Sequence, residues 1–164
     1  MKDKSGIVRE QRLVGYDDAV NFIPYYTSDV WSMEEDYFIF YSQRNGVISL
    51  NRYFPGQEKY ELILEMGSWA SSFTSQKDPF SELVCSGHVR NTETVLLPFE
   101  NRICHVSIPG KSMRFSNARF PDDTQLAGPF HVSHDGKYLT GVNYGRSPSK
   151  IERTSIFVYD IAGE

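Results

Sequence analysis

Two histidines three residues apart, His131 and His134, are the first candidates for chemistry, because imidazole pairs are common zinc ligands. His131 lies at the end of an apolar run and His134 in the turn that follows, and no third or fourth ligand is spaced for a metal. We interpret them as a strand residue and a turn residue and expect no metal ligand here. His88 and His105 stand in separate apolar runs without a neighbouring acid or nucleophile, so neither receives a role.

Adjacent carboxylates at Asp122 and Asp123 are the second candidate, for acid–base work or for cation binding. Neighbouring acids before a threonine in a proline-containing segment are more typical of turns. The sequence also contains no glycine-rich phosphate loop, nucleophile elbow or helix with paired histidines. We therefore assign no catalytic residue within this chain.

The third candidate is a set of aromatic and arginine residues in the long polar segments between apolar runs. Aromatic rings stack on sugar rings, and guanidinium groups pair with carboxylates. The alternative is that several of these aromatic side chains fill gaps between packed sheets. The residues that we expect to bind substrate are Tyr25, Tyr26, Trp69, Arg119, Tyr144 and Arg146.

The apolar runs that must position these residues recur along the chain. A run that ends in a Gly-containing turn appears three times, with its glycine at Gly56, Gly110 and Gly163, which are 54 and 53 residues apart. A second apolar run precedes each one, at residues 37–41, 94–98 and 138–143. Several short strands in a period near fifty residues are typical of a β-propeller. The alternative is a β-sandwich with evenly spaced hairpins.

The repeat predicts an all-β fold, a partial β-propeller of about three antiparallel blades from a ring of seven. We place the blades at residues 15–66, 67–116 and 117–164, with residues 1–14 as the candidate strand that closes a ring. The third blade should lack its outer strand. Its apolar edge would then be unpaired, and the chain alone would not form a closed, stable domain.

Individual strands and loops follow from the same pattern. We expect strands at residues 47–54, 82–86, 102–108, 112–115 and 154–161. In the strand at residues 59–65, we expect Tyr60, Leu62 and Leu64 to share one face and Glu61, Ile63 and Glu65 the other. We expect loops at residues 21–28, 42–46, 67–80, 116–129 and 144–153, all at one end of the blades.

Composition excludes several kinds of partner. The net charge is −4 and no basic block is present, so nucleic acid is not expected. No apolar run is long enough to cross a bilayer, and the N-terminus does not resemble a signal peptide, so we expect a cytoplasmic protein without a membrane partner. The two cysteines, Cys85 and Cys104, lie in apolar runs and are expected to be buried free thiols.

The third unit resembles a known family. Residues 133–139 read Ser-His-Asp-Gly-Lys-Tyr-Leu, and residues 156–164 read Ile-Phe-Val-Tyr-Asp-Ile-Ala-Gly-Glu. Both segments resemble the units of TolB-type, WD-repeat-like propellers, although His134 stands where that family usually has proline. The order of an Arg-x-x-Arg-Leu-like start, an aromatic loop and blades with long connections is similar to the oligogalacturonate lyase group.

This resemblance implies a function for a longer protein. It implies a polysaccharide lyase that cleaves acidic, galacturonate-type oligosaccharides by β-elimination, with the remaining blades of its own propeller as partners. The group's metal-binding and catalytic residues belong to later blades, so manganese is implied only for the full-length protein. Arg119 and Arg146 are the best candidates to pair with substrate carboxylates. The alternatives are a non-catalytic TolB-like propeller that binds a protein partner and the propeller domain of a serine peptidase.

Overall fold

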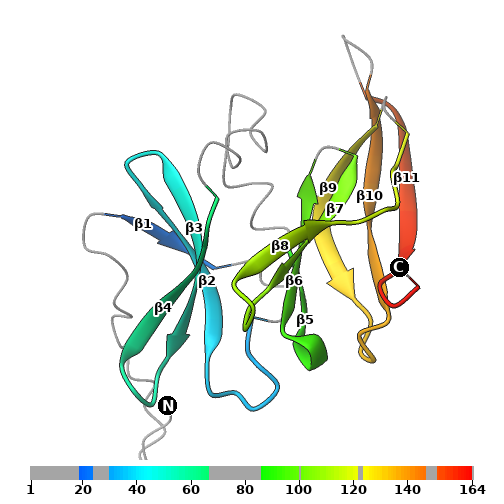
Figure 1. Ribbon diagram of the computed structural model, residues 1–164. Helices are drawn as coiled ribbons and strands as arrows, with labels where there is room; N and C mark the ends of the chain where they lie inside the picture. The colour runs from blue at the N-terminus through cyan, green and yellow to red at the C-terminus, as the bar shows by residue number, and fades with distance from the viewer. Residues whose placement is uncertain are drawn as a thin grey trace, which may run out of the picture.

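A computed structural model describes residues 19–23, 30–66, 86–99, 101–121, 124–146 and 151–163. These residues form three separate antiparallel β-sheets, and their helical content is one 3-10 turn, Arg90–Thr92. The sheets lie side by side like the blades of a fan (Figure 1). The prediction of an all-β partial propeller is therefore confirmed. No helix in the described part of the chain is long and apolar enough to cross a membrane.

Each sheet follows the chain order as a meander, and we call the sheets blades 1 to 3. Blade 1 contains β1 (Val20–Phe22), β2 (Phe38–Arg44), β3 (Val47–Phe54) and β4 (Lys59–Glu65). Blade 2 contains β5 (Gly87–Val89), β6 (Thr94–Phe99), β7 (Arg102–Ser107) and β8 (Ser112–Phe115). Blade 3 contains β9 (Thr124–Val132), β10 (Tyr138–Arg146) and β11 (Ile151–Asp160).

The third strand of each blade ends at a regular interval. These ends are Phe54, Ser107 and Asp160, 53 residues apart both from 54 to 107 and from 107 to 160. The glycine-based spacing is therefore off by one residue in its first interval. Gly56 lies two residues beyond the end of β3, whereas Gly110 lies three residues beyond the end of β7.

The inner strand of blade 1 is made of two pieces, which corrects the expected loop at residues 21–28. Phe22 pairs with Tyr41 of β2. The amide of Ile39 donates to the carbonyl of Val30 (2.9 Å), so residue 30 lies on the same edge of β2. Residues 24–29 lie outside the described part of the chain.

Three other boundaries differ from the expectation, and a fourth is untested. β2 continues to Arg44 and leaves only a two-residue turn, because Asn45 and Gly46 take positive φ (50° and 77°) as a tight hairpin requires. The expected strand at residues 82–86 lies outside the described part of the chain except for Ser86, which directly precedes β5. β9 begins inside the expected loop at residues 116–129. β10 and β11 extend into the expected loop at residues 144–153.

The expected alternation in β4 fails at the end of the strand. The register shifts where Leu50 pairs with Leu64 but Asn51 pairs with Leu62, so Ile63 is an extra residue in a bulge. Ile63 is 4% exposed in the core and Leu62 is 39% exposed on the other face, as the alternation predicts. Beyond the bulge, however, Leu64 packs against the same core cluster as Ile63 rather than lying on the face of Leu62.

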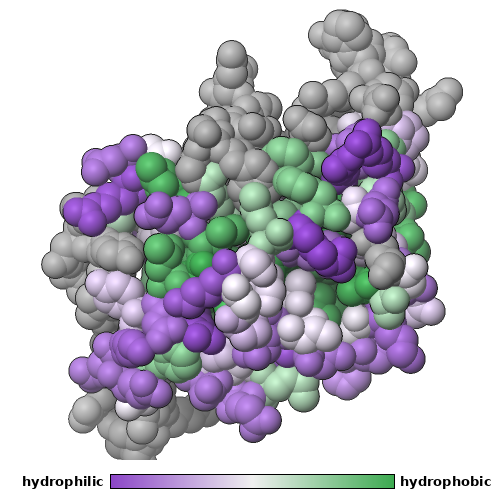
Figure 2. Space-filling view, viewed as in Figure 1, coloured by the Kyte–Doolittle hydropathy of each residue, from purple (hydrophilic) through white to green (hydrophobic). Residues whose placement is uncertain are grey.

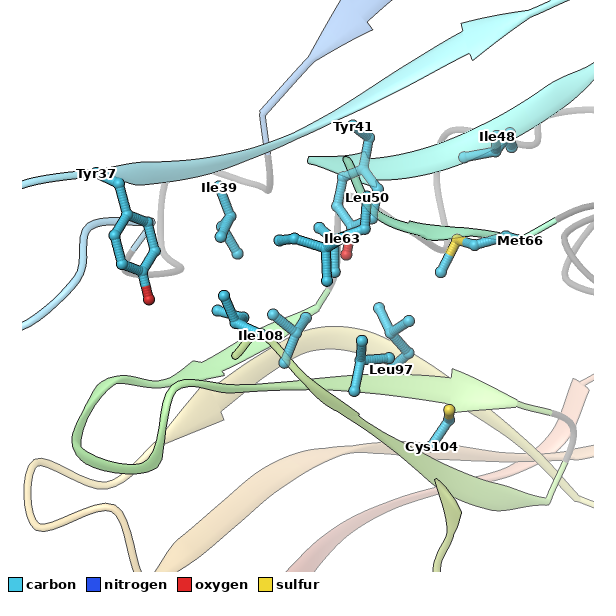
Figure 3. Close-up of a cluster of buried hydrophobic side chains, with 12 residues drawn as sticks. Tyr37, Ile39, Tyr41, Ile48, Leu50, Ile63, Met66, Leu97, Cys104 and Ile108 are labelled. Carbon is cyan, nitrogen blue, oxygen red and sulfur yellow. The ribbon is translucent and has the colours of Figure 1, made fainter. Parts of the chain in front are cut away.

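Two hydrophobic clusters join the three blades. Between blades 1 and 2, side chains of β2 and β3 point toward those of β6 and β7 (Figure 3). Between blades 2 and 3, Leu96 and Ile103 meet Phe130, Leu139 and Phe157. Cys104 belongs to the first cluster as a buried free thiol, as expected, and burial raises its pKa to about 12. Cys85 lies outside the described residues.

A directional hydrogen bond accompanies the apolar contact between blades 2 and 3. His105 of β7 is buried, and its Nε2 lies 2.8 Å from the hydroxyl oxygen of Tyr159. Arg114 donates to Nδ1 of the same imidazole (3.2 Å). A guanidinium can only donate, so Nδ1 accepts and the ring is the neutral Nε2–H tautomer. His105 therefore donates to Tyr159 across the interface.

The outward face of blade 3 is apolar and exposed. Ile156 is 80% and Val158 is 68% exposed on β11, and Tyr138 of β10 is 45% exposed. Apolar surface is visible along the β11 side of the molecule (Figure 2). Within the described residues β11 pairs only with β10, so its other edge carries no described strand. Residues 1–14, the candidate closing strand, lie outside the described part of the chain.

Asp135 holds the β9–β10 turn together and predicts a pH dependence. Its carboxylate accepts from the Ser133 hydroxyl (2.7 Å) and the Lys137 amide (3.2 Å), and these hydrogen bonds lower its pKa to about 2. An unfolded-chain aspartate titrates near about 3.9. We expect the stabilising contribution of Asp135 to be full above about pH 4 and to be lost as the pH falls toward 2.

A carboxyl titration by NMR tests this expectation. We expect the Asp135 signal to have its midpoint near pH 2 and to shift upward in Ser133→Ala, because the serine hydroxyl makes the largest contribution. A titration midpoint at about pH 4 in the unaltered chain would mean that the turn does not hold the Asp135 carboxylate in this geometry.

Candidate functional site

The connections of the blades fall on two opposite ends. One end, which we call the loop face, carries the ends of β2, β6 and β10, the starts of β3, β7 and β11 and the described part of the link between blades 2 and 3; it is uppermost in Figure 1. The other end, which we call the turn face, carries the remaining hairpin turns. Because strand ends from all three blades share the loop face, residues far apart in sequence can meet there.

Arg119 is the expected site residue that the structure describes in full. It is exposed, and it lies in the link between blades 2 and 3. The main chain is anchored on both sides of it. The Ser116 hydroxyl donates to the carbonyl of Ala118 (2.9 Å), and Phe120 exchanges two hydrogen bonds with Asn101 of the β6–β7 turn (2.9 Å each). The position of Arg119 is therefore fixed while its side chain reaches solvent.

A ring contact extends this anchor into the core. Phe120 packs edge-on against Phe157 of β11, with ring centroids 4.8 Å apart. The link that carries Arg119 is thus tied both to blade 2 and to blade 3.

The other expected site residues are less completely placed. Tyr144 and Arg146 lie on β10 near its loop-face end, where Tyr144 pairs with Thr154 and Arg146 with Ile151. They are strand residues rather than the loop residues that we expected. Tyr25, Tyr26 and Trp69 lie outside the described part of the chain, so their role stays a prediction.

The loop face carries two further arginines, which the sequence did not lead us to expect. Arg44 ends β2 and is exposed, and Arg102 begins β7, with its guanidinium 6.0 Å from the ring centre of Phe115. Both flank the turn between the second and third strands of a blade, as Arg146 does in blade 3. Their equivalent position in the repeat was the signal that could have identified them.

Arginines recur on the loop face. Each blade has an arginine beside its loop-face turn, and Arg119 adds a fourth in a link. Glu65, at the end of β4, lies near Arg44 on the same face. The turn-face connections carry most of the other described acids, accompanied by lysines and Arg90: Glu34, Glu35, Asp36, Glu58, Glu93 and Asp135. Because a guanidinium group pairs with a carboxylate, the arginines are the described loop-face groups that could bind an anionic ligand.

A hollow of about 320 Å³ lies on the outward side of blade 1 near Arg44, with Ser42, Ser49 and Glu65 also in its wall. Asn51 is fully buried in the same sheet, and its amide nitrogen donates to the hydroxyls of Ser42 (2.9 Å) and Ser49 (3.1 Å). Its amide oxygen is buried and has no hydrogen-bond partner among the described residues. This polar network forms only because the strands pair, and no local sequence pattern predicts it.

The candidate metal ligands are not gathered. His131 and His134 are both exposed, one at the end of β9 and one in the turn after it. Within the described residues, no group of three or more histidine, cysteine, aspartate or glutamate side chains is placed to hold a metal ion.

No family model matches this sequence, and no curated protein matches it. Among solved structures, the chain is similar to an oligogalacturonate lyase from Vibrio parahaemolyticus, with 12% identity, a TM-score of 0.66 and coverage of 93% of this chain. It is similar to an oligogalacturonate lyase in complex with manganese, with 12% identity, a TM-score of 0.60 and 82% coverage. It is also similar to TolB from Acinetobacter baumannii, with 12% identity, a TM-score of 0.52 and 88% coverage.

The chain spans 41%, 32% and 30% of the lengths of these three proteins. At 12% identity the likeness establishes the fold and leaves the activity to be tested. The chain has the fold of a partial TolB-type β-propeller and resembles the oligogalacturonate lyase group.

Proposed function

We propose that this chain is part of a propeller polysaccharide lyase that acts on acidic, galacturonate-type oligosaccharides. In this proposal the chain supplies scaffold and substrate-positioning groups on the loop face, and other blades supply the catalytic residues. The observation that carries it is the arginine beside the loop-face turn of every blade, on a fold similar to two oligogalacturonate lyases.

The chemistry of β-elimination explains why arginines would be useful. A base removes the proton α to the uronate carboxylate, and a cation neutralises that carboxylate as negative charge develops. Manganese would serve as this cation in the full-length protein. Arg119 and Arg146 would pair with carboxylates of the sugar units, since a guanidinium binds a carboxylate through two parallel hydrogen bonds. Tyr25, Tyr26, Trp69 and Tyr144 would stack on sugar rings.

Incubation of the full-length protein with trigalacturonate, with and without manganese, tests the proposal. We expect the ultraviolet absorbance of the unsaturated product to rise in the presence of manganese. No rise with manganese across neutral and alkaline pH would remove the lyase proposal.

Replacing Arg119 with alanine should weaken binding of trigalacturonate about threefold to tenfold. The variant loses a charge-assisted hydrogen bond to the substrate carboxylate. The expected effect on affinity is modest because solvent screens an exposed charge pair. Lys111→Gln, which removes one positive charge from the turn face, is the matched control and should leave the Kd unchanged. Equal weakening in both variants would mean that only the overall charge matters. Isothermal titration of both variants makes the comparison.

The likeness to TolB supports a second candidate, a non-catalytic propeller that binds a protein partner. The exposed Ile156 and Val158 would suit such a contact. This candidate predicts partner capture without turnover of any pectic oligomer. The sequence beyond these residues separates the candidates, because a hydrolase domain with a serine nucleophile would instead indicate a peptidase.

A further inference from the structure

A second hollow lies on the turn face, at the other end of the blades from the loop-face arginines. Its volume is about 560 Å³, within the range of small-ligand sites. The first hairpin turn of each blade contributes to it, so it lies where three blades converge. Its walls are formed by Met33, His88, Arg90, Asn91, Val132, Ser133, His134 and Gly136.

Contacts between the turns fix the shape of this hollow. Arg90 donates through Nη2 to the carbonyl of Ser32 in blade 1 (2.7 Å). Asn91 donates to the carbonyl of Asp135 in blade 3 (3.4 Å). Gly136 takes a positive φ (71°), which favours glycine, and a Cβ atom there would lie 2.5 Å from the Asn91 amide oxygen, so the two turns approach closely. The hollow is therefore built by the fold rather than by one mobile side chain.

The side chains in its walls favour an anion. They include one guanidinium and two imidazoles, and none of the described residues that line the hollow is an aspartate or a glutamate. Two carboxylates of the neighbouring turns, those of Asp135 and Glu93, are engaged in other contacts. Asp135 accepts from Ser133 and pairs with Lys137 (3.2 Å), and Glu93 accepts from Tyr37 (2.5 Å). A donor-rich hollow thus lies within a face that is otherwise rich in acids.

We propose that this hollow binds the oxyanion group of a small ligand, a carboxylate or a phosphate. Arg90 supplies the fixed positive charge, His88 forms the inner wall at 5% exposure, and His134 lies exposed at the rim. A cationic donor set of this kind pairs with oxyanions through charge-assisted hydrogen bonds. The site shares no residue with the loop face, so its failure and the failure of the lyase proposal are separate outcomes.

The four histidines of the chain provide an internal test. His88 and His134 line the hollow, whereas His105 is buried between blades 2 and 3 and His131 lies on β9 outside the lining. Imidazole NMR signals are followed while the full chain is titrated with sodium succinate, inorganic phosphate or uncharged succinamide at constant pH and ionic strength. We expect the signals of His88 and His134 to move with succinate or phosphate, and those of His105 and His131 to stay.

The anion that moves the signals identifies the source as a carboxylate or a phosphate. Succinamide, which matches succinate in size without its charge, should have no effect. The proposal would be overturned if the signals of His88 and His134 did not reach saturation with either anion at tens of millimolar. It would also be overturned if the signals of all four histidines moved equally.

Two variants connect the binding to the hollow. Arg90→Gln should lower the affinity for the anion about tenfold or more, because it removes a charge-assisted hydrogen bond. Because Arg90 also links two blades, His134→Ala is the second variant; its exposed side chain is not needed for folding, and we expect about threefold weakening. Lys137→Gln removes a neighbouring charge outside the lining and should bind as the unaltered chain does. Unchanged affinity in both Arg90→Gln and His134→Ala would overturn the assignment.

Discussion

Replacing Phe157 with alanine should destabilise the chain by about 3–5 kcal/mol, the usual cost of emptying a large aromatic site in a core. The Phe157 ring is 8% exposed and makes edge contacts with Phe120 (4.8 Å) and Phe130 (5.8 Å). Its ring also lies so close to Gly141 that a Cβ there would be 2.7 Å away. The loss would appear as a lower denaturant midpoint in a urea titration followed by circular dichroism.

The neighbouring residue provides the control for this prediction. Ile156 points to the opposite side of β11 and is 80% exposed, so Ile156→Ala should change the free energy of unfolding by less than about 0.5 kcal/mol. Equal losses for the two variants would contradict the alternation in which one face of β11 packs on blade 2 and the other faces outward.

The second large effect concerns the outward face of blade 3. We expect the 164-residue chain to self-associate, because Ile156, Val158 and Tyr138 expose apolar surface beside a strand edge that carries no partner among the described residues. The double variant Ile156→Lys, Val158→Lys should weaken self-association about tenfold or more, since each buried aliphatic side chain contributes about 1.5–3 kcal/mol.

Light scattering over a concentration series measures this effect. Met113→Lys, which places the same charge on an exposed residue of β8 in blade 2, should leave the association unchanged. A monodisperse monomer with a cooperative thermal transition, in the unaltered chain, would contradict the idea that further blades cover this face.

Much of the fold could be predicted because apolar runs and turn residues mark the repeat locally in the sequence. β3 and β8 have the predicted bounds. The Asn45 and Gly46 turn and the Asp135 and Gly136 turn lie where the sequence places them, because positive φ at Gly46 and Gly136 demands these residue types.

The errors arise where contacts between strands override local pattern. β1 was expected as loop because Pro24 follows closely, yet three residues suffice to pair with the edge of β2. β9 passes through Gly128 and Pro129, which read as a loop, and an inner edge strand tolerates a proline that a central strand does not. Leu64 lies on the same face as Ile63 because of a bulge that only the pairing with β3 reveals.

The candidate site was predictable in part for the same reason. Arg119 was identified by its residue type and its place in a long link. What fixes it is the pair of hydrogen bonds between Phe120 and Asn101, nineteen residues apart in sequence, and no local pattern records that contact. Arg44 and Arg102 stand at equivalent positions in the repeat, but the strand ends that place them beside the turns are fixed by strand pairing.

The most direct test of the loop face as an acidic-sugar site is a titration of the chain with trigalacturonate, followed by backbone amide NMR. We predict shifts at Asn101, Arg102, Arg119 and Phe120, with little change at the turn-face residues 33–36 and 55–58. Fully methyl-esterified trigalacturonate, which lacks the carboxylate charges, should leave these signals in place. Absence of shifts on the loop face, or equal shifts with the ester, would contradict the account.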